Sequence, residues 1–213
     1  LLPGRLSNSE PSSVDIRPRS FLYGRVTQAG YQLHKEPSAD SEVIEEMAMD
    51  AVHRISRITL SEDNASPNRI WYELGHKGYA HSSYIQPVRK QVNQELWAVP
   101  ESGRLGEITM PFVDAYNSLK QNRSIVYRFY YASTFWVLER VFDDDGSPWY
   151  KLLDDRTYAS YYVPAYNVRL VPFSELNPIS WDVPPGIKKI IVDLDTQSLT
   201  AYEGEKSVFM TRI

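Results

Sequence analysis

One sequence pattern occurs twice in this 213-residue chain. Residues 71–74 read Trp-Tyr-Glu-Leu and residues 149–152 read Trp-Tyr-Lys-Leu, and a Tyr-Ala pair follows each of them, at Tyr79 and at Tyr158. The step from the Trp to that Tyr is eight residues in the first copy and nine in the second. An internal repeat of this kind predicts two tandem modules of one fold.

The composition indicates short strands rather than long helices. Aromatic residues make up 13% of the chain, with 15 Tyr and 5 Trp, and there are 14 Pro against 10 Gly. Aromatic residues favour strands, and Pro and Gly mark the turns between them. We therefore expect an all-β protein. The net charge of -4 lacks the positive charge that a phosphate backbone attracts, so we expect no nucleic-acid partner.

The chain contains no Cys, which excludes disulfides, Cys-ligated zinc and a thiol nucleophile. The run Asp143–Gly146 lacks the spacing and the terminal Glu of an EF-hand, and we interpret it as a hairpin turn. His34, His53, His76 and His81 match no zinc-ligand spacing, and we expect them to be scattered over the surface. The sequence predicts no metal site and no cofactor.

Residues 21–88 form the first predicted module. Residues 51–60 are predicted as a strand, although Val52, Ile55 and Ile58 recur every three residues and would also suit a helix. The segments Tyr31–Ser38, Trp71–Leu74 and Gly78–Ile85, in this order, resemble the bacterial SH3 (SH3b) domain. The sequence His-Lys-Glu at residues 34–36 departs from the Arg-containing turn that is usual in that family. The resemblance implies a small β-barrel.

Residues 105–172 form the second predicted module, which the repeat marks as a second SH3-like barrel. Its strand at residues 133–142 has apolar side chains on both sides, with Phe135 and Val137 on one side and Trp136 and Phe142 among those on the other. We expect both faces of this strand to be covered. Residues 1–20 are predicted to be a flexible linker, residues 89–104 a connector, and residues 173–187 a Pro-rich bridge.

Residues 188–213 have strand signals at residues 190–194, at residues 199–203 and from Ser207 onward. The segment Ile191–Phe209 resembles the first strands of the bacterial L,D-transpeptidase (YkuD-type) catalytic domain, which opens a β-sandwich. The run from Ser207 stops in mid-strand, so we expect the start of a truncated domain. In that family a Ser-His-Gly-Cys segment further along supplies the Cys that is acylated, and this sequence contains none of it.

The two resemblances together imply a function in the bacterial cell wall. We expect a non-catalytic region that binds and positions on peptidoglycan an exported L,D-transpeptidase-like protein, with stem peptides or glycan as the ligand. The alternative is that the parent protein cross-links peptidoglycan through a Cys acyl-enzyme and that the barrels are only architectural or gating. No apolar run approaches the roughly twenty residues of a membrane span, and the chain starts at Leu1, so membrane contact would need a missing leader or anchor. We expect a monomer.

Exposed aromatic rings in a groove are the usual means by which a small β-module binds peptide or glycan. The candidates are aromatic or imidazole side chains near strand ends: Tyr31, Trp71, Tyr79, His81, Tyr84, Tyr131, Tyr158 and Tyr161. Trp71 and Tyr79 also suit a core position, and we favour exposure for His81 and Tyr84. Neighbouring Tyr residues on a strand point to opposite faces, so about half of those in the second module are expected to be buried. Asp193 and Asp195 are not expected to be catalytic, because no nucleophile accompanies them, and Asp195 is predicted to begin a turn.

Overall fold

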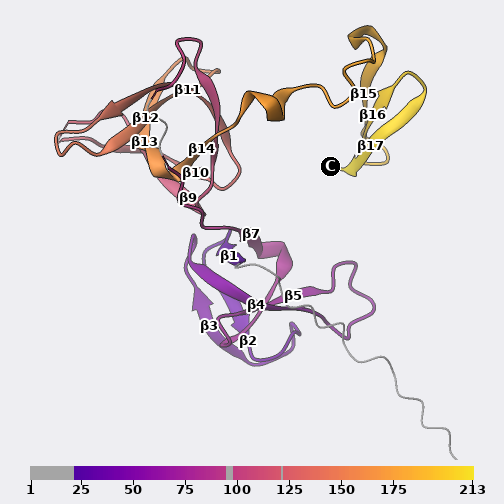
Figure 1. The fold of residues 1–213 in the computed structure, drawn as a ribbon. Helices are drawn as coiled ribbons and strands as arrows, with labels where there is room; N and C mark the ends of the chain where they lie inside the picture. The colour runs from indigo at the N-terminus through magenta and orange to yellow at the C-terminus, as the bar shows by residue number, and fades with distance from the viewer. Residues whose placement is uncertain (1–21, 95–97, 121) are drawn as a thin grey trace, which may run out of the picture. The chain divides into compact units, whose positions relative to one another are not determined.

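The computed structural model describes residues 22–94, 98–120 and 122–213. The predicted linker at residues 1–20 and Trp97 of the predicted connector lie outside the described residues. The described chain is all-β, as predicted, and its strands form three antiparallel sheets (Figure 1). Two compact units are distinguished, one up to Leu170 and the other from Val171 onward.

The first sheet has seven strands in the order β3-β2-β6-β5-β4-β1-β7. Its strands are β1 (Tyr23–Val26), β2 (Tyr31–His34), β3 (Val43–Met47), β4 (Val52–Leu60), β5 (Ile70–Leu74), β6 (Gly78–His81) and β7 (Ile85–Val88), with the 3₁₀ helix η1 (Ser82–Tyr84) between β6 and β7. The strand prediction for residues 51–60 is confirmed by β4, in which Ile55 and Thr59 are buried.

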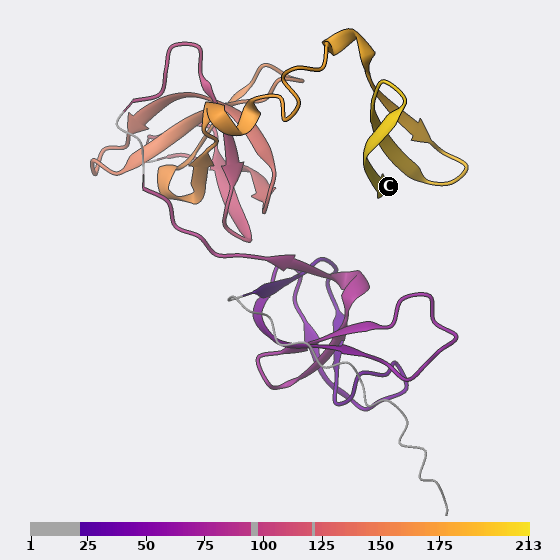
Figure 2. The same ribbon diagram turned by 45° about the vertical axis from the view of Figure 1, so that its right-hand side comes forward.

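The second sheet repeats this order strand for strand, as β10-β9-β13-β12-β11-β8-β14. Its strands are β8 (Arg104–Ile108), β9 (Phe112–Tyr116), β10 (Ile125–Tyr130), β11 (Thr134–Phe142), β12 (Pro148–Leu153), β13 (Ser160–Pro164) and β14 (Val168–Leu170), with the 3₁₀ helix η2 (Ala165–Asn167) before β14. In two views the strands of each sheet group together (Figures 1 and 2). Neither seven-stranded sheet is closed into a barrel among the described residues.

The repeat is therefore structural, but its register differs from the one that the Tyr-Ala pairs predict. Trp71 pairs with His81, and Trp149 pairs with Pro164. Three residues join β5 to β6, whereas the turn between β12 and β13 covers residues 154–159. Because the second turn is longer, Tyr158 lies in the turn with a positive φ of 58°, whereas Tyr79 lies in β6.

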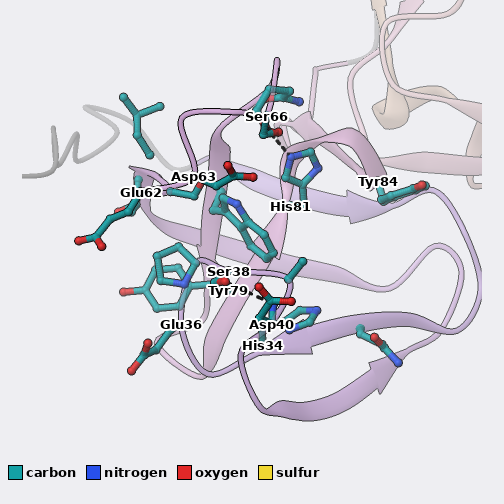
Figure 3. A pocket seen from close by; sticks show the side chains of 18 of the residues that line it. His34, Glu36, Ser38, Asp40, Glu62, Asp63, Ser66, Tyr79, His81 and Tyr84 are labelled. Carbon is teal, nitrogen blue, oxygen red and sulfur yellow. Dashed lines mark hydrogen bonds between the residues drawn. The ribbon is translucent and has the colours of Figure 1, made fainter.

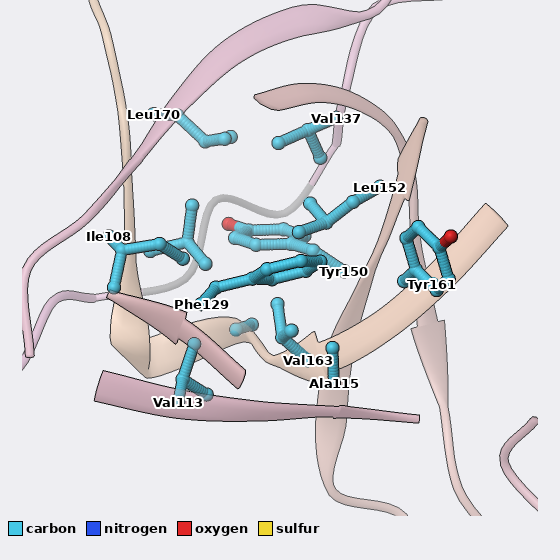
Figure 4. Packing of buried hydrophobic residues seen from close by; sticks show 12 residues of the cluster. Ile108, Val113, Ala115, Phe129, Val137, Tyr150, Leu152, Tyr161, Val163 and Leu170 are labelled. Atoms are coloured by element: carbon cyan, nitrogen blue, oxygen red, sulfur yellow. The ribbon is translucent and has the colours of Figure 1, made fainter. Parts of the chain in front are cut away.

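The second sheet encloses the larger buried cluster (Figure 4). Tyr150, Leu152 and Val137 are 0% exposed, and Tyr150 lies in the middle of the labelled side chains. The expectation that both faces of residues 133–142 are covered is wrong, because Trp136 is 36% and Phe142 55% exposed. The indole Nε1 of Trp136 donates a hydrogen bond to the Ser102 carbonyl at 2.9 Å, which holds that ring at the surface.

The predicted turn after β11 is stabilised by the carboxylate of Asp143. Its oxygens accept hydrogen bonds from the Ser147 amide at 2.9 Å, the Asp145 amide at 3.2 Å and the Trp149 indole at 2.9 Å. These bonds favour the charged form, and the bond from Ser147 contributes most to holding the pKa of Asp143 below its ordinary value.

We expect Asp143→Asn to lower the melting temperature at neutral pH, because the amide cannot replace a charged acceptor of three hydrogen bonds. A depressed folded-state pKa stabilises the fold above the unfolded-state pKa, and this stabilisation is lost as the pH falls through the folded-state value. The difference between the two proteins should therefore shrink below about pH 4. Thermal unfolding followed by circular dichroism from pH 7 to pH 2.5 measures it. A parallel decline for the neighbouring Asp144→Asn variant would contradict this assignment.

The third sheet has the order β15-β16-β17, with β15 (Lys188–Asp193), β16 (Ser198–Glu203) and β17 (Lys206–Arg212). The 3₁₀ helices η3 (Phe173–Leu176) and η4 (Pro185–Ile187) precede it. The first strand ends at Asp193 rather than at residue 194, because the Asp193 carboxylate accepts the amides of Asp195 at 2.9 Å and Thr196 at 3.0 Å. Asp193, not Asp195, therefore shapes this turn.

Candidate functional site

A cavity of about 880 Å³ opens on the first sheet between two loops (Figure 3). The β2–β3 loop, residues 35–42, forms one side, and the β4–β5 loop, residues 61–69, forms another. Strands β2, β4, β5 and β6 supply the remaining wall, and Tyr31, Trp71 and Tyr79 are its aromatic residues. The strand order places β6 between β2 and β5, so residues far apart in the sequence meet in this wall.

Trp71 is the central ring of the wall. It is 4% exposed, and the rings of His34 and His81 approach it edge-on, with centroid distances of 5.5 Å and 5.2 Å. Edge-to-face packing of this kind favours one orientation of each ring. The indole is therefore a fixed part of the wall, and its position depends on strands β2 and β6.

Hydrogen bonds determine which nitrogen of each imidazole carries the proton. In His34, Nδ1 lies 3.1 Å from the Ser41 carbonyl and donates to it, which leaves Nε2 as an acceptor in the neutral ring. In His81, Nε2 donates to the Asn68 carbonyl at 2.9 Å, and Nδ1 accepts the Ser83 amide at 3.4 Å. Both nitrogens of His81 are engaged, whereas Nε2 of His34 has no partner among the described residues.

A pair of tyrosines completes the aromatic surface. The rings of Tyr31 and Tyr84 lie 4.6 Å apart between centroids, and the Tyr31 hydroxyl accepts a hydrogen bond from the His81 amide at 3.0 Å. Burial raises the pKa of Tyr31 above its ordinary value, so this hydroxyl stays protonated at neutral pH. Tyr84 is 39% exposed and presents its ring to solvent at the edge of the cavity.

Acidic side chains dominate the opening of the cavity. They are Glu36 and Asp40 from one loop and Glu62 and Asp63 from the other, as labelled in Figure 3. A basic side chain, Arg57, also lines the cavity among the described residues, and its Nε lies 3.5 Å from a carboxylate oxygen of Glu73. The charge of the opening is therefore negative.

Five of the eight predicted ligand-binding residues line this cavity: Tyr31, Trp71, Tyr79, His81 and Tyr84. The three in the second sheet are not brought together with them. Tyr131 is half-buried after β10, and Tyr158 is 81% exposed in a turn. Tyr161 is 8% exposed, and the prediction that it is an exposed contact is wrong, because its ring packs edge-on against Phe129 at 5.7 Å in the core.

The sequence reasoning missed His34 and the loop carboxylates. His34 was expected to be a scattered surface residue, yet it is 6% exposed and packs against Trp71. Its position beside the apolar Leu33 in the Tyr31–Ser38 segment was the available signal. No group of three or more His, Asp or Glu residues in the described part of the chain could hold a metal ion.

The second sheet has an equivalent corner, where the end of β9 meets the start of β12, and a side chain of the chain itself occupies it. Trp149 is the second residue of β12 and Tyr116 the last of β9, as Trp71 and His34 are in β5 and β2. Tyr116 meets Trp149 edge-on at 5.5 Å. The guanidinium carbon of Arg123 lies 4.7 Å from the Trp149 ring and 5.2 Å from the Tyr116 ring, and its Nη1 lies 3.6 Å from Asp143. A cation of the chain itself thus occupies this corner.

Comparison with known proteins identifies no relative, because no family model and no curated protein matches the chain. None of the helices found in the described residues has the length and hydropathy that a bilayer-spanning helix needs. The geometry of the cavity is therefore the basis on which a function is proposed.

Proposed function

We propose that the two seven-stranded sheets are SH3-like modules and that the chain is the peptidoglycan-binding and positioning region of an exported bacterial L,D-transpeptidase-like protein. The observation that carries this proposal is the aromatic cavity of the first sheet. Tyr31, Trp71, Tyr79 and Tyr84 converge on one opening of about 880 Å³, which is within the size range of known ligand sites. The resemblance to SH3b domains and to the start of a YkuD-type domain directs the choice of ligand to stem peptides or glycan.

The physical argument for a peptide or glycan ligand is the combination of a fixed wall and an exposed edge. Trp71 is held by its edge-on neighbours, so little conformational entropy is lost when a ligand covers it. Tyr84 offers an amphipathic ring at the edge, where it contacts Tyr31 and is 39% exposed. Such a surface suits a chain with both apolar and hydrogen-bonding groups.

We expect the purified chain to be retained by insoluble peptidoglycan and Tyr84→Ala to weaken this retention about tenfold, since a contact aromatic contributes about 1–2 kcal/mol. Tyr166→Ala is the matched control, because Tyr166 is 45% exposed and lies in η2, the counterpart of η1. Co-sedimentation with purified sacculi measures both. Equal retention of wild type and Tyr84→Ala would remove the cavity from the binding function, and no retention of wild type would end the wall-binding proposal.

A second candidate function is that the parent protein is the L,D-transpeptidase itself. The observation that favours it is the third sheet, in which Ile190 is 68% and Ile191 45% exposed. Neighbouring strand residues point to opposite faces, so both faces of this sheet present apolar side chains that a larger domain would bury. The chain described has no Cys and would not form the acyl-enzyme. A Ser-His-Gly-Cys segment encoded downstream of Ile213 supports this candidate, and a stop codon there contradicts it.

The modules would then serve recruitment or gating. Transpeptidation by the complete protein with and without residues 21–172 separates these roles when it is measured beside co-sedimentation. Loss of wall retention with unchanged turnover of soluble stem peptides indicates recruitment. A changed turnover of soluble peptides indicates gating or an architectural role.

A further inference from the structure

We propose that the cavity of the first sheet binds a positively charged group of its ligand, an ammonium or guanidinium group. The proposal rests on the proposed binding function of this cavity and specifies the chemistry of what it binds. It follows from a comparison of the two repeats, because the second repeat has the guanidinium group of Arg123 at the position where the first repeat has Ser41.

The corners correspond residue by residue. The β2–β3 loop and the β9–β10 loop both lie between paired strand ends, His34 with Val43 and Tyr116 with Ile125. Equivalent backbone hydrogen bonds close the two loops, from Lys35 N to Glu42 O at 2.9 Å and from Asn117 N to Ser124 O at 3.2 Å. Counted from these closing bonds, Arg123 of the second loop corresponds to Ser41 of the first.

In the second sheet the side chain of Arg123 occupies the corner between β9 and β12. Its guanidinium group faces two aromatic rings and lies near the Asp143 carboxylate. A cation over an aromatic ring is attracted by the negative face of the π-system, and a carboxylate adds to that attraction. Ser41 supplies no charge at the equivalent position of the first sheet, and the Arg57 that lines the cavity from β4 lies 3.5 Å from the Glu73 carboxylate.

The first cavity has the acidic groups that such a cation needs. Of its four carboxylates, the Asp63 side chain accepts the Ala65 amide at 2.9 Å. Glu36, Asp40 and Glu62 have no side-chain partner among the described residues. Carboxylates that share one opening with low-dielectric walls attract cations more strongly than isolated surface charges do.

His34 provides a second, independent indication. The residue is 6% exposed and lines the cavity, and its Nδ1 is already engaged with Ser41. Its Nε2 has no donor among the described residues and is not one of the fully buried polar atoms that lack a partner, so it is an acceptor that the cavity leaves accessible. An ammonium or guanidinium N–H of the ligand would supply the missing donor.

Three versions of one stem-type tripeptide, L-Ala-γ-D-Glu-L-Lys, test the proposal on the full chain. The first version is acetylated at the α-amine, the second at the lysine side chain, and the third at both. We expect one mono-acetylated peptide to bind about tenfold or more tightly than the doubly acetylated peptide, because a charge-assisted contact is lost in the latter. The mono-acetylated peptide that binds more tightly shows whether the bound ammonium group is the α-amine or the lysine side-chain amine. Chemical-shift titration that follows the Trp71 indole measures the affinities, and equal affinity of all three, or binding by none, overturns the proposal.

A substitution that copies the second repeat tests the location. Ser41→Arg should place a guanidinium group in the cavity and reduce binding of the preferred peptide by about tenfold or more. Ser41→Gln removes the same hydroxyl, which accepts the Glu36 amide at 2.9 Å, but adds no charge, and it should bind the peptide nearly as wild type does. Equal binding by Ser41→Arg and Ser41→Gln would contradict the proposed position of the cation.

The contribution of the carboxylates has its own matched control. Glu36→Gln combined with Glu62→Gln should weaken binding of the charged peptide and leave binding of the doubly acetylated peptide unchanged. Glu45→Gln combined with Glu46→Gln changes the net charge equally on exposed β3 positions outside the cavity and should leave both affinities unchanged. If the two double variants weakened binding equally, the effect would come from the net charge of the protein rather than from the cavity, and the proposal would be overturned.

Failure of this inference is distinguishable from failure of the proposed function. Sacculi whose free amines have been acetylated with acetic anhydride should retain the chain less than untreated sacculi do. Equal retention by acetylated and untreated sacculi would support the wall-binding function and contradict the proposal that the cavity binds a cationic group. Absence of retention by either material would end the wall-binding proposal, while the tripeptide titration would still decide whether the cavity binds an ammonium group.

Discussion

Tyr150→Ala is expected to lower the free energy of unfolding of the second sheet by about 3–5 kcal/mol. Tyr150 is 0% exposed at the centre of the cluster in Figure 4, where Leu152 and Val163 are also 0% exposed. Truncation removes a whole ring from a close-packed interior, and neighbours on paired strands cannot collapse into the space without breaking the ladder between β12 and β13. A loss of this size approaches the total stability of many domains, so the second sheet should be partly unfolded at 25 °C.

Urea denaturation followed by tryptophan fluorescence measures this loss, because Trp136 and Trp149 both lie on strands of the second sheet. Tyr150→Phe is the matched control, since it keeps the ring and its packing and should cost no more than about 1.5 kcal/mol. A cost for Tyr150→Ala close to that of Tyr150→Phe would show that the ring is not the centre of this core. Binding at the first sheet should be unchanged in both variants, because its cavity lies on separate strands.

The strand signals predicted the all-β fold well because they are local. The turn at Asp143 follows from a side chain that bonds to its own backbone, whereas the strand at residues 51–60, whose apolar residues recur every three positions, was assigned from the strand signals around it. The strand end at Asp193 was predicted one residue too late for a related reason, since a carboxylate bonding to the two following amides ends the strand. Features that depend on residues only a few positions apart can be predicted from a sequence.

Burial and register were harder to predict because they depend on partners that are distant in the sequence. The Tyr-Ala pairs of the two repeats look equivalent, yet a longer turn moves Tyr158 out of its strand. Tyr161 was predicted to be exposed, but its side of β13 faces Phe129 of β10 across the core. Such a choice of face is set by the strand pairing, which the residue pattern alone does not specify.

The aromatic part of the candidate site was predictable, whereas its charge was not. Tyr31, Trp71 and Tyr79 lie on neighbouring strands, so a correct strand order brings them together. The carboxylates come from two loops that are separated by strands β3 and β4, and only the folded chain shows that Asp40 and Asp63 line one opening. The cation of the second repeat, Arg123, was likewise hidden, because its loop shares no sequence pattern with the first.

Gly78→Ala is expected to disturb the binding site and the fold together, because Gly78 begins the strand that carries Tyr79 and His81. A methyl group at Gly78 would lie 2.5 Å from the His34 carbonyl oxygen and 2.8 Å from a side-chain carbon of Ile44. The carbonyl belongs to the backbone of β2, so it cannot rotate away as a flexible side chain would. Relief of the clash requires β2 and β6 to separate, at a cost of about 1–3 kcal/mol.

This separation should also reduce ligand binding, because the two strands are joined at a narrow seam. The register between β2 and β6 consists of His34 opposite Tyr79, and both residues line the cavity. We expect Gly78→Ala to shift the Trp71 indole resonance and to weaken tripeptide binding by about tenfold or more, since a displacement near 1 Å disrupts a preorganised site. Gly186→Ala is the control, because a methyl group there meets open space. Unchanged urea stability and unchanged binding in Gly78→Ala would show that the seam is not what holds the two histidine rings against Trp71.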